Sequence, residues 1–393
     1  MEEMGIVIVG GGIAGLATSL ALHRKGIKSV VLERAESLRS DGAALGVQTN
    51  GWKALEQLGV AHILRLSSLP FYQIRSVLVE NGKRYESAAP VSYGEARCIK
   101  RNDLVKVLAD ALPQGTIRFG CRVASVKLDE TTSFPIIRVQ DGTNIKAKVL
   151  IGCDGANSVV AEFLRLNRTK VCASRAVRGL TSYPNGHGFR HEFVRIKTDD
   201  VLCGRLPITA HSVFWFALVP NCSADSKNFK DQEAVQKLTL RSIKELSEEW
   251  KEMVKKCDKS SLYMSSLRYR TPWEILFGKF RTGTVTVAGD AMHMMGPFLG
   301  QGGSSALEDA VVMARCLAEK IEKCGDSRKR IEEGIDEYVR ERRMRLFSLS
   351  TQTYLTGLCI ESSSRVVKLM FMVFVMVLFF DPIHHTRYDC GRL

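Results

Sequence analysis

The sequence lacks any apolar stretch long enough to cross a bilayer. Its longest, LMFMVFVMVLFF at Leu369–Phe380, has twelve residues, whereas a spanning helix needs about twenty. We interpret it as a helix packed on the domain or at a partner interface, and the alternative is peripheral contact with a membrane surface. No N-terminal targeting peptide is seen either, because a glycine turn already begins at residue 10. The expected location is therefore the cytoplasm.

Cysteine pairs with the CxxC spacing are also missing. The eleven cysteines are scattered between Cys98 and Cys390. An odd number of cysteines without the spacing of a disulfide framework favours free thiols in a reducing compartment. His187 and His191 have the i, i+4 spacing of helical metal ligands, but Gly188 between them disfavours a helix. We therefore expect no metal site there.

Positive charge is not concentrated in one stripe, although the formal net charge is +14. The densest basic stretch, residues 328–345, contains five acidic residues among seven basic ones. Such mixed charge is typical of a solvated helix and does not indicate a phosphate-binding surface. We expect no nucleic-acid partner.

A dinucleotide-binding turn is present at the start of the chain. The apolar run Ile6–Val9 predicts a buried parallel strand, and GGGIAG at residues 10–15 follows it, before an apolar helix and a second strand at Val30–Leu32. The expected contacts with the cofactor are Gly10, Gly12, Ile13, Ala14 and Gly15.

Each glycine of this turn has a separate physical role. Gly10 permits the tight turn, Gly12 lets the backbone approach a pyrophosphate, and Gly15 lets the helix lie close to the strand. The helix N-terminus then offers N–H groups to the phosphates. Glu33 directly follows the second strand, where its carboxylate can accept hydrogen bonds from an adenosine ribose. Arg34 beside it is a further expected cofactor contact. This first turn does not distinguish NAD(P) from FAD.

Two later stretches favour the larger cofactor. Val149–Ile151 predicts a strand that leads into the turn Asp154-Gly155, and Val285–Ala288 predicts another that leads into the glycine-bearing loop 289–303. A helix is expected from Ser304 onward. A simple NAD dehydrogenase does not need a second strand-to-acid turn aimed at its cofactor so far along the chain, whereas an extended FAD does.

The three stretches together resemble the fingerprint of the single-component FAD-dependent aromatic hydroxylases, the family of p-hydroxybenzoate hydroxylase, salicylate hydroxylase and zeaxanthin epoxidase. That family carries GxGxxG, a central DG and GDAxHxxxPxxGQG. The last motif is present here as GDAMH at 289–293, Pro297, and GQG at 300–302. The resemblance covers most of residues 5–320, and the ending YDCGRL resembles plant members of the salicylate-hydroxylase-like group.

This resemblance implies FAD bound without a covalent link and NAD(P)H as a transient co-substrate. Asp290 should accept hydrogen bonds from the ribityl chain. The loop beside the flavin ring should contribute Pro297, Gly300, Gln301, Gly302 and Gly303. Its N–H groups, together with the positive end of the following helix, would stabilise negative charge on the reduced ring.

Further positions follow from the same resemblance. Asp154 should lie near the FAD pyrophosphate and take part in NAD(P)H binding, and Arg101 and Arg39 match arginines that contact the cofactor. Residues 42–46 would run beside the flavin. One departure concerns the DG motif, because Ala161 stands where the family has an arginine. This departure puts the details of NAD(P)H binding in doubt.

The expected fold class is α/β, with a Rossmann-like FAD domain of the glutathione-reductase type and an inserted, mainly antiparallel substrate domain. The stretch 191–220 has short β-rich runs with breaks at Gly204 and Pro207, and residues 225–256 have helical spacing. The predicted FAD domain comprises 1–75, 91–177 and 273–340, the substrate domain 76–90 and 178–272, and a helical tail 341–393.

The resulting functional hypothesis is an FAD-dependent NAD(P)H monooxygenase. It would insert one oxygen atom of O2 into an aromatic or isoprenoid-type small molecule through a C4a-hydroperoxyflavin. No catalytic acid or base is expected in the protein, because the flavin performs the chemistry, and we assign His293 a structural role. One alternative is a membrane-associated flavin epoxidase or quinone hydroxylase, and another is a flavin-binding regulatory protein with little turnover.

The substrate pocket is less well defined by the sequence. Several strand aromatics could line an apolar pocket, although such residues more often belong to the core: Phe189, Phe193, Phe214, Trp215 and Phe216. Four arginines are compatible with an acidic substrate, but no motif distinguishes them from solvated surface: Arg178, Arg190, Arg195 and Arg205.

Overall fold

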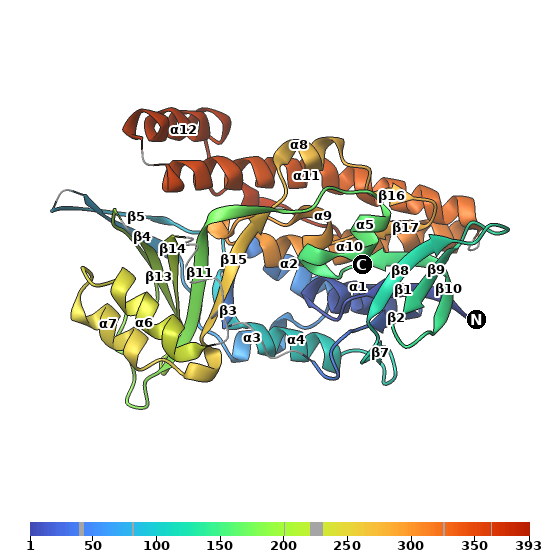
Figure 1. The fold of residues 1–393 in the computed structure, drawn as a ribbon, viewed down its shortest axis with the longest axis horizontal. Helices are drawn as coiled ribbons and strands as arrows, with labels where there is room; N and C mark the ends of the chain where they lie inside the picture. The colour runs from blue at the N-terminus through green and yellow to red at the C-terminus, as the bar shows by residue number, and fades with distance from the viewer. Residues whose placement is uncertain (39–42, 81, 200, 221–230, 325–326, 363) are drawn as a thin grey trace.

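The computed structural model describes residues 1–38, 43–80, 82–199, 201–220, 231–324, 327–362 and 364–393. The molecule is elongated (Figure 1), with one β-sheet near each end and long helices running between them. Among the nine cysteines that the structure describes there is no disulfide.

The first sheet has the strand order β16-β17-β10-β1-β2-β7, and a branch through β9 and β8 extends it from β10. Its central strands are parallel, because β1 pairs with β10 and β2, and β10 pairs with β17. The strands are β1 (Glu2–Val9), β2 (Ser29–Leu32), β7 (Ile117–Arg118), β8 (Val123–Leu128), β9 (Pro135–Val139), β10 (Asn144–Gly152), β16 (Arg281–Thr282) and β17 (Val285–Val287).

Helices cover this sheet on both sides, so its central strands are apolar on both faces. Ile6 to Val9 are no more than 5% exposed. A small sheet of β3 (Ala44–Val47) and β6 (Arg97–Lys100) lies beside these helices. The helices are α1 (Ile13–Arg24), α2 (Thr49–Gln57), α3 (Ala61–Leu66), α4 (Arg101–Asp110), α5 (Val159–Phe163), α8 (Pro272–Phe277), α9 (Asp290–His293), α10 (Gly302–Cys324) and α11 (Arg328–Glu361).

The second sheet has the strand order β15-β11-β14-β13-β12-β4-β5. All its pairings are antiparallel except β12 with β4, which joins segments far apart in sequence in parallel. The antiparallel sheet predicted for the middle of the chain is present. The strands are β4 (Gln73–Glu80), β5 (Lys83–Pro90), β11 (Lys170–Ser182), β12 (Phe193–Lys197), β13 (Leu202–Thr209), β14 (Ser212–Pro220) and β15 (Tyr263–Tyr269).

The two faces of the second sheet have different neighbours. Helices α6 (Gln232–Ser242) and α7 (Glu248–Lys255) cover the outer face, where Trp215 packs with Trp250 and Met253. The inner face meets the first domain, because Phe216 packs in clusters that also contain Ala44 and Phe298. The predicted domain boundaries at 177/178 and 340/341 fall inside β11 and α11.

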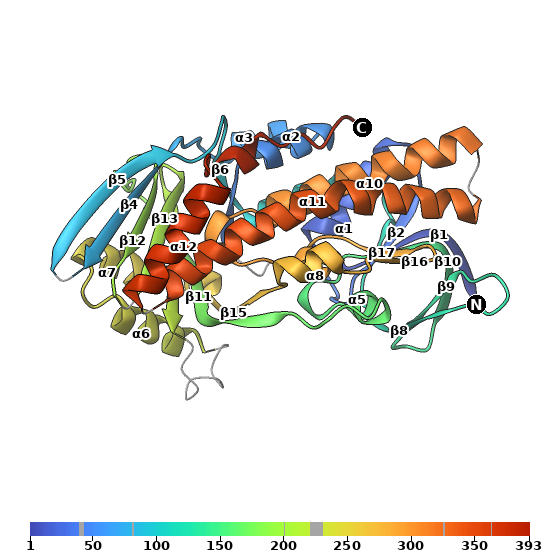
Figure 2. The same ribbon diagram turned by 90° about the horizontal axis from the view of Figure 1, so that it is seen from above.

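The C-terminal region folds back over the first domain. Helix α12 (Arg365–Leu378) packs on α11, and residues 384–393 then return to α2, where the Leu393 N–H donates to Gln57 Oε1 at 3.1 Å. Figure 2 shows this return path from above. Within the described part of the chain, no helix has both the length and the apolarity that a bilayer crossing requires.

Candidate cofactor site

Three strand ends meet side by side at one edge of the first sheet. Val9 pairs with Gly152, and Gly152 pairs with Val287. The turns that leave these strands therefore begin next to one another. Those turns contain the three motifs predicted from sequence: GGGIAG, the Asp154-Gly155 turn and the Gly289-Asp290 turn.

The first turn has the geometry that its glycines predict. Gly10 has φ +105°, and a Cβ atom there would lie 2.5 Å from the Cys153 carbonyl oxygen. A Cβ at Gly15 would lie 1.9 Å from the Gly10 carbonyl oxygen, so only glycine lets α1 approach the strand end. A Cβ at Gly12 would meet no atom within 4 Å. The space in front of Gly12 is thus open, as a bound pyrophosphate requires. Ile13 and Ala14 begin α1 directly behind it.

Glu33, which directly follows the second strand, stabilises this turn through hydrogen bonds. Its Oε2 accepts the Gly11 N–H at 2.7 Å and its Oε1 accepts the Ala35 N–H at 2.9 Å. A carboxylate at the end of this strand is the group that hydrogen-bonds a ribose hydroxyl in dinucleotide-binding folds. Arg34 is exposed beside it, and Arg39 lies outside the described residues.

Asp290 is an exposed residue between the buried Gly289 and Ala291. Desolvation by the surrounding protein raises the pKa of its carboxyl above the ordinary value, and the nearby charges of His293 and Arg101 oppose this shift only in part. The carboxylate of Asp290 is therefore accessible to solvent although neighbouring protein partly desolvates it. The charge of Arg101, at the start of α4, also acts on Arg178 in the second sheet. Arg101 is thus close enough to both Asp290 and Arg178 for its charge to act on each.

The glycine loop, residues 294–303, continues from this point. Pro297 and Gly300 are exposed, and Cβ atoms at Gly300 and Gly302 would meet no atom within 4 Å. A Cβ at Gly303, by contrast, would lie 2.6 Å from Leu45 Cδ1, so that glycine serves packing against β3. Helix α10 begins at Gly302, and its first N–H groups have no acceptor within the helix.

Gln301 fixes this loop from inside the protein. Its side chain is fully buried. Its Oε1 accepts from Asn50 Nδ2 at 2.7 Å, and its Nε2 donates to Gln48. Gln301 therefore holds the glycine loop to α2, and its amide does not face the open side. Asn50 also donates to Glu308 Oε1 at 2.6 Å, which links the loop to α10.

A buried ionic cluster lies behind the site. Asp309 accepts from His293 Nε2 at 2.6 Å, from the Gly289 N–H at 2.8 Å and from Arg342 Nε at 2.7 Å. Desolvation by burial acts to raise the pKa of Asp309. The charges of His293 and Arg342 lower it by more, so the pKa lies well below its ordinary value. His293 is 0% exposed and contacts Asp309 behind the cofactor turn. Its structural role stays a prediction.

Sequence reasoning missed the partners of His293. Glu308 and Asp309 are adjacent acids in an apolar helix, and both are 0% exposed. Arg342, equally buried, lies 2.8 Å from Glu308. Two neighbouring acids among buried alanines and valines were the available signal, because such acids need a buried cation.

Asp154 caps its own turn. Its Oδ2 accepts the Val159 N–H at 2.7 Å, its Oδ1 accepts the Ser158 hydroxyl at 2.5 Å, and burial raises its pKa. Ala161, where the family has arginine, is 6% exposed inside α5. Arg268 of β15 donates to Asn157 Oδ1 at 3.2 Å. Arg268 thus brings a positive charge to the Asp154-Gly155 turn, where Ala161 replaces the arginine of the family.

One row of residues crosses the inner face of the second sheet. Arg178 pairs with Phe216, Phe216 with Gly204, and Gly204 with Arg195. A Cβ at Gly204 would lie 2.3 Å from Phe216 Cε1, so the phenyl ring lies over this glycine. The two arginines and Phe216 are half-buried. Arg178 donates to Ser265, Arg195 donates to Ser76, and burial lowers the pKa of both guanidinium groups.

Several other residues singled out in this region have packing roles, whereas Arg190 is exposed. His187 Nε2 lies 2.8 Å from the Thr209 carbonyl oxygen and its Nδ1 accepts the Phe189 N–H at 2.9 Å. The guanidinium of Arg205 lies 3.9 Å from the centre of the Phe189 ring. Trp215 faces the outer core and Phe214 the inner one.

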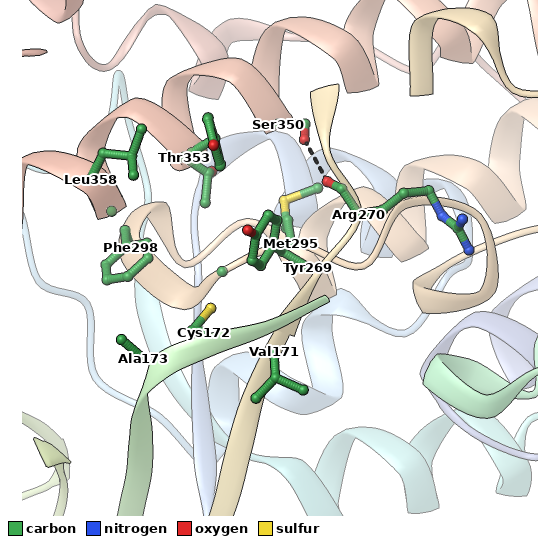
Figure 3. Close-up of a pocket in the computed structure, with 13 residues that line it drawn as sticks. Val171, Cys172, Ala173, Tyr269, Arg270, Met295, Phe298, Ser350, Thr353 and Leu358 are labelled. Atoms are coloured by element: carbon green, nitrogen blue, oxygen red, sulfur yellow. Dashed lines mark hydrogen bonds between the residues drawn. The ribbon is translucent and has the colours of Figure 1, made fainter. Parts of the chain in front are cut away.

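A cavity of about 100 Å³ lies behind the glycine loop (Figure 3). Met295 and Phe298 of the loop, Cys172 of β11, and Thr353 and Leu358 of α11 line it. Cβ atoms at Gly296 and Gly357 would lie 2.8 and 2.5 Å from Phe298 Cε2. The Phe298 ring therefore fits between two glycines and connects the loop to α11.

The arrangement defines a class of protein. The three adjacent turns provide open space at Gly12 and an acid at Asp290, and the glycine loop that follows is open at Gly300 and Gly302. This arrangement on a doubly wound sheet suits one extended dinucleotide, and we call it the open track. A second sheet faces the end of that track. These are the features of a flavoprotein oxidoreductase.

Comparisons with known proteins identify the family. Residues 3–352 match the family model described as FAD binding domain. The chain is 61% identical to Monooxygenase 1 and 38% identical to Monooxygenase 2, both of Arabidopsis thaliana, over the full length of each pair. The chain therefore belongs to the FAD-binding-domain family of monooxygenases, and it is an FAD-dependent oxidoreductase of the aromatic-hydroxylase type.

Solved structures support the fold. Klebsiella pneumoniae HpxO, complexed with FAD and uric acid, has a TM-score of 0.80 at 20% identity, covering 98% of this chain and 96% of that one. The 2,6-dihydroxypyridine-3-hydroxylase of Arthrobacter nicotinovorans has a TM-score of 0.74 at 19% identity, covering 92% and 93%. This similarity confirms the predicted α/β fold class. The match to the FAD binding domain family confirms the FAD cofactor.

Proposed function

We propose that this monooxygenase oxidises NAD(P)H and transfers one atom of O2 to an aromatic small molecule. The reaction converts NAD(P)H, H⁺, O2 and an aromatic C–H group into NAD(P)⁺, water and a phenolic C–OH group. Bound FAD would supply the redox chemistry, by accepting two electrons from the nicotinamide and activating O2 at ring carbon C4a. The protein binds and orients the reactants and keeps water out.

The proposed cofactor contacts follow the open track. The N–H groups at the start of α1, beside Gly12, would bind the pyrophosphate, and Glu33 would accept from the ribose. Asp290 would accept from the ribityl hydroxyls, and Arg101 would lie beside it. The backbone from Gly300 to Gly302, at the positive end of α10, would stabilise negative charge on the reduced ring.

The row Arg178–Phe216–Gly204–Arg195 supports an anionic, planar substrate. Within the described residues, neither guanidinium forms an ion pair with a carboxylate, although both are half-buried on the face toward the cofactor turns. A half-buried cation without an anion is costly unless a ligand supplies one. Phe216 between them offers an apolar surface for an aromatic ring. We therefore favour an aromatic carboxylate or phenolate.

The first experiment follows the flavin colour of the purified protein. Anaerobic addition of NADH or NADPH should bleach the bound flavin, and an aromatic acid should accelerate the bleaching. In air, the accelerating compound should yield a product that carries one oxygen atom from labelled O2. Failure of both nicotinamides to bleach the flavin, with or without aromatic ligands, would instead favour the regulatory flavoprotein.

Two matched variants test the substrate assignment. Arg178→Met or Arg195→Met should raise the KM for an anionic aromatic at least tenfold, because a hydrogen bond to a charged group contributes about 1.5–3 kcal/mol. Arg84→Met, on the exposed strand β5, is the control and should leave KM unchanged. FAD absorbance should be retained in all three. Equal KM values in the variants and the control would exclude both arginines from substrate binding.

The second candidate is an epoxidase or quinone hydroxylase that takes an apolar substrate from a membrane. Helix α12 favours it, because its apolar side chains are exposed. In this case NAD(P)H oxidation should be stimulated by an alkene lipid or a quinone in vesicles. Aromatic acids should not stimulate it. Arg178→Met should then leave turnover unchanged.

A further inference from the structure

Helix α12 and the residues just after it, up to Phe380, expose an unusual amount of apolar surface. Ten large apolar side chains between residues 366 and 380 are 41–94% exposed: Val366, Leu369, Met370, Met372, Val373, Phe374, Met376, Val377, Leu378 and Phe380. Together they expose on the order of 1,000 Å², above the ~300–600 Å² of the largest patch on a typical monomer. A surface of this size in water requires an occupant.

The exposed residues surround most of the helix. Successive residues of an α-helix are about 100° apart, so the exposed positions cover roughly two-thirds of the circumference. The remaining third, with Phe371 and Val375 only partly exposed, faces α11. A flat protein partner would cover one side of such a helix, whereas hydrocarbon chains can surround it.

A second exposed apolar group lies on the same side of α11. Trp273 is 49% and Phe277 is 81% exposed on α8. Figures 1 and 2 show α8 and α12 together on the outer side of α11. Tryptophan is enriched at membrane–water interfaces, where its ring contacts both apolar and polar groups.

The charge distribution favours an anionic occupant. No acidic residue occurs between positions 362 and 380, and the chain has a formal net charge of +14. Two copies with this charge repel one another, whereas an anionic lipid surface attracts each of them.

We propose that α12, together with α8, docks on the surface of an anionic lipid bilayer. The 14 residues of α12 span about 21 Å, too little to cross the roughly 30 Å hydrocarbon core. The helix would lie in the interface with its exposed side chains among the acyl chains. This proposal goes beyond the monooxygenase activity and does not depend on it.

The experiment is vesicle flotation of the full-length, FAD-loaded protein. One set of vesicles contains phosphatidylcholine alone, and the other contains phosphatidylcholine with phosphatidylglycerol. We expect binding to both, stronger on the anionic set, with the difference lost at high salt. The triple variant Met370→Gln, Val373→Gln, Val377→Gln removes one exposed stripe of α12 and should lower the partition coefficient at least tenfold.

A matched triple variant controls for nonspecific loss of hydrophobicity. Ile63→Gln, Leu66→Gln, Leu69→Gln changes three exposed apolar residues at and just after α3, on the opposite edge of the molecule in Figure 1. It should bind vesicles like the parent protein. Retained flavin absorbance in both variants shows that each is folded, and it separates this test from that of turnover.

Two outcomes would overturn the proposal. The first is that the parent protein floats with neither vesicle set while its flavin stays bound. The second is a dimer in lipid-free solution that the α12 variant converts to a monomer, without any difference between parent and variant in vesicle binding. The second outcome would assign the surface to another copy of the chain.

Discussion

Arg342 on α11 donates from Nε to Oδ1 of Asp309 on α10 at 2.7 Å, and both side chains are 0% exposed. Asp309 also accepts the N–H of Gly289 and a hydrogen bond from His293. The cofactor turn at Gly289-Asp290 is therefore held from behind by an ion pair between two long helices.

Loss of this ion pair should be strongly destabilising. Arg342→Met removes the positive charge that pairs with the buried carboxylates of Asp309 and Glu308. We therefore expect a loss of about 3–5 kcal/mol in the free energy of unfolding. Arg340→Met changes a side chain of the same helix that is 76% exposed, and should change stability by less than about 0.5 kcal/mol. Urea unfolding measures both. Similar midpoints would contradict the structural role of the cluster.

Alanine substitutions at two glycines of the first turn, Gly12 and Gly15, should have different effects on stability and on FAD binding. Gly12→Ala projects into open space, so the apoprotein should remain as stable as the parent, while the Kd for FAD rises roughly tenfold or more. Gly15→Ala collides with the Gly10 carbonyl and should cost about 3 kcal/mol or more. Calorimetry of the apoproteins and FAD titration separate these effects. A destabilised Gly12→Ala apoprotein would argue against open space at this position.

His385 should make stability fall in mild acid. Burial, followed by the charge of Arg345, lowers the pKa of this histidine to about 4, whereas an exposed histidine titrates near 6.5. Between these values the unfolded chain binds the proton and the folded chain does not, so stability falls as the pH drops from about 6.5 to 4. The loss is at most roughly 3 kcal/mol.

The variant His385→Gln tests this dependence. Its amide can still donate to Gln48, as His385 Nε2 does at 3.3 Å, but it does not titrate. The stability of the variant should therefore depend less on pH between 6.5 and 4. Parallel pH profiles for the variant and the parent would show that His385 is not the responsible group.

Gly357 predicts a coupling between α11 and the glycine loop. Gly357→Ala improves helix propensity by about 1 kcal/mol, but its Cβ would lie 2.5 Å from Phe298. We expect the ring and its loop to shift, with a changed flavin absorbance spectrum. The double variant Gly357→Ala, Phe298→Leu removes the collision and should restore the parent spectrum. An unchanged spectrum in the single variant would show that the loop accommodates the added methyl group without any change around the flavin.

Local sequence signals were sufficient for the cofactor turns. Val9 and Leu32 end strands where the apolar runs predict. The strand predicted at 149–151 extends to Gly152, and the one predicted at 285–288 ends at Val287, each within one residue of the prediction. Glycine spacing depends on backbone geometry within a few residues, so the turn at 10–15 can be derived from its own sequence.

Contacts between distant segments could not be derived in this way. The row of Arg178 and Arg195 depends on the register of four strands, and no single strand contains that information. The partner of Asp309 likewise lies on another helix at Arg342. Arg178 and Arg195 therefore resemble ordinary surface arginines until the strand pairing is known.

The parallel pairing of β12 with β4 has a consequence for how the protein is assembled. The chain leaves the first sheet for the second at β4, returns, and leaves again at β11. A gene fragment encoding only residues 170–270 would lack β4 and would expose β12 as a free edge, open to aggregation. The second sheet is therefore complete only after segments remote in sequence have paired, and such non-local contacts tend to slow folding.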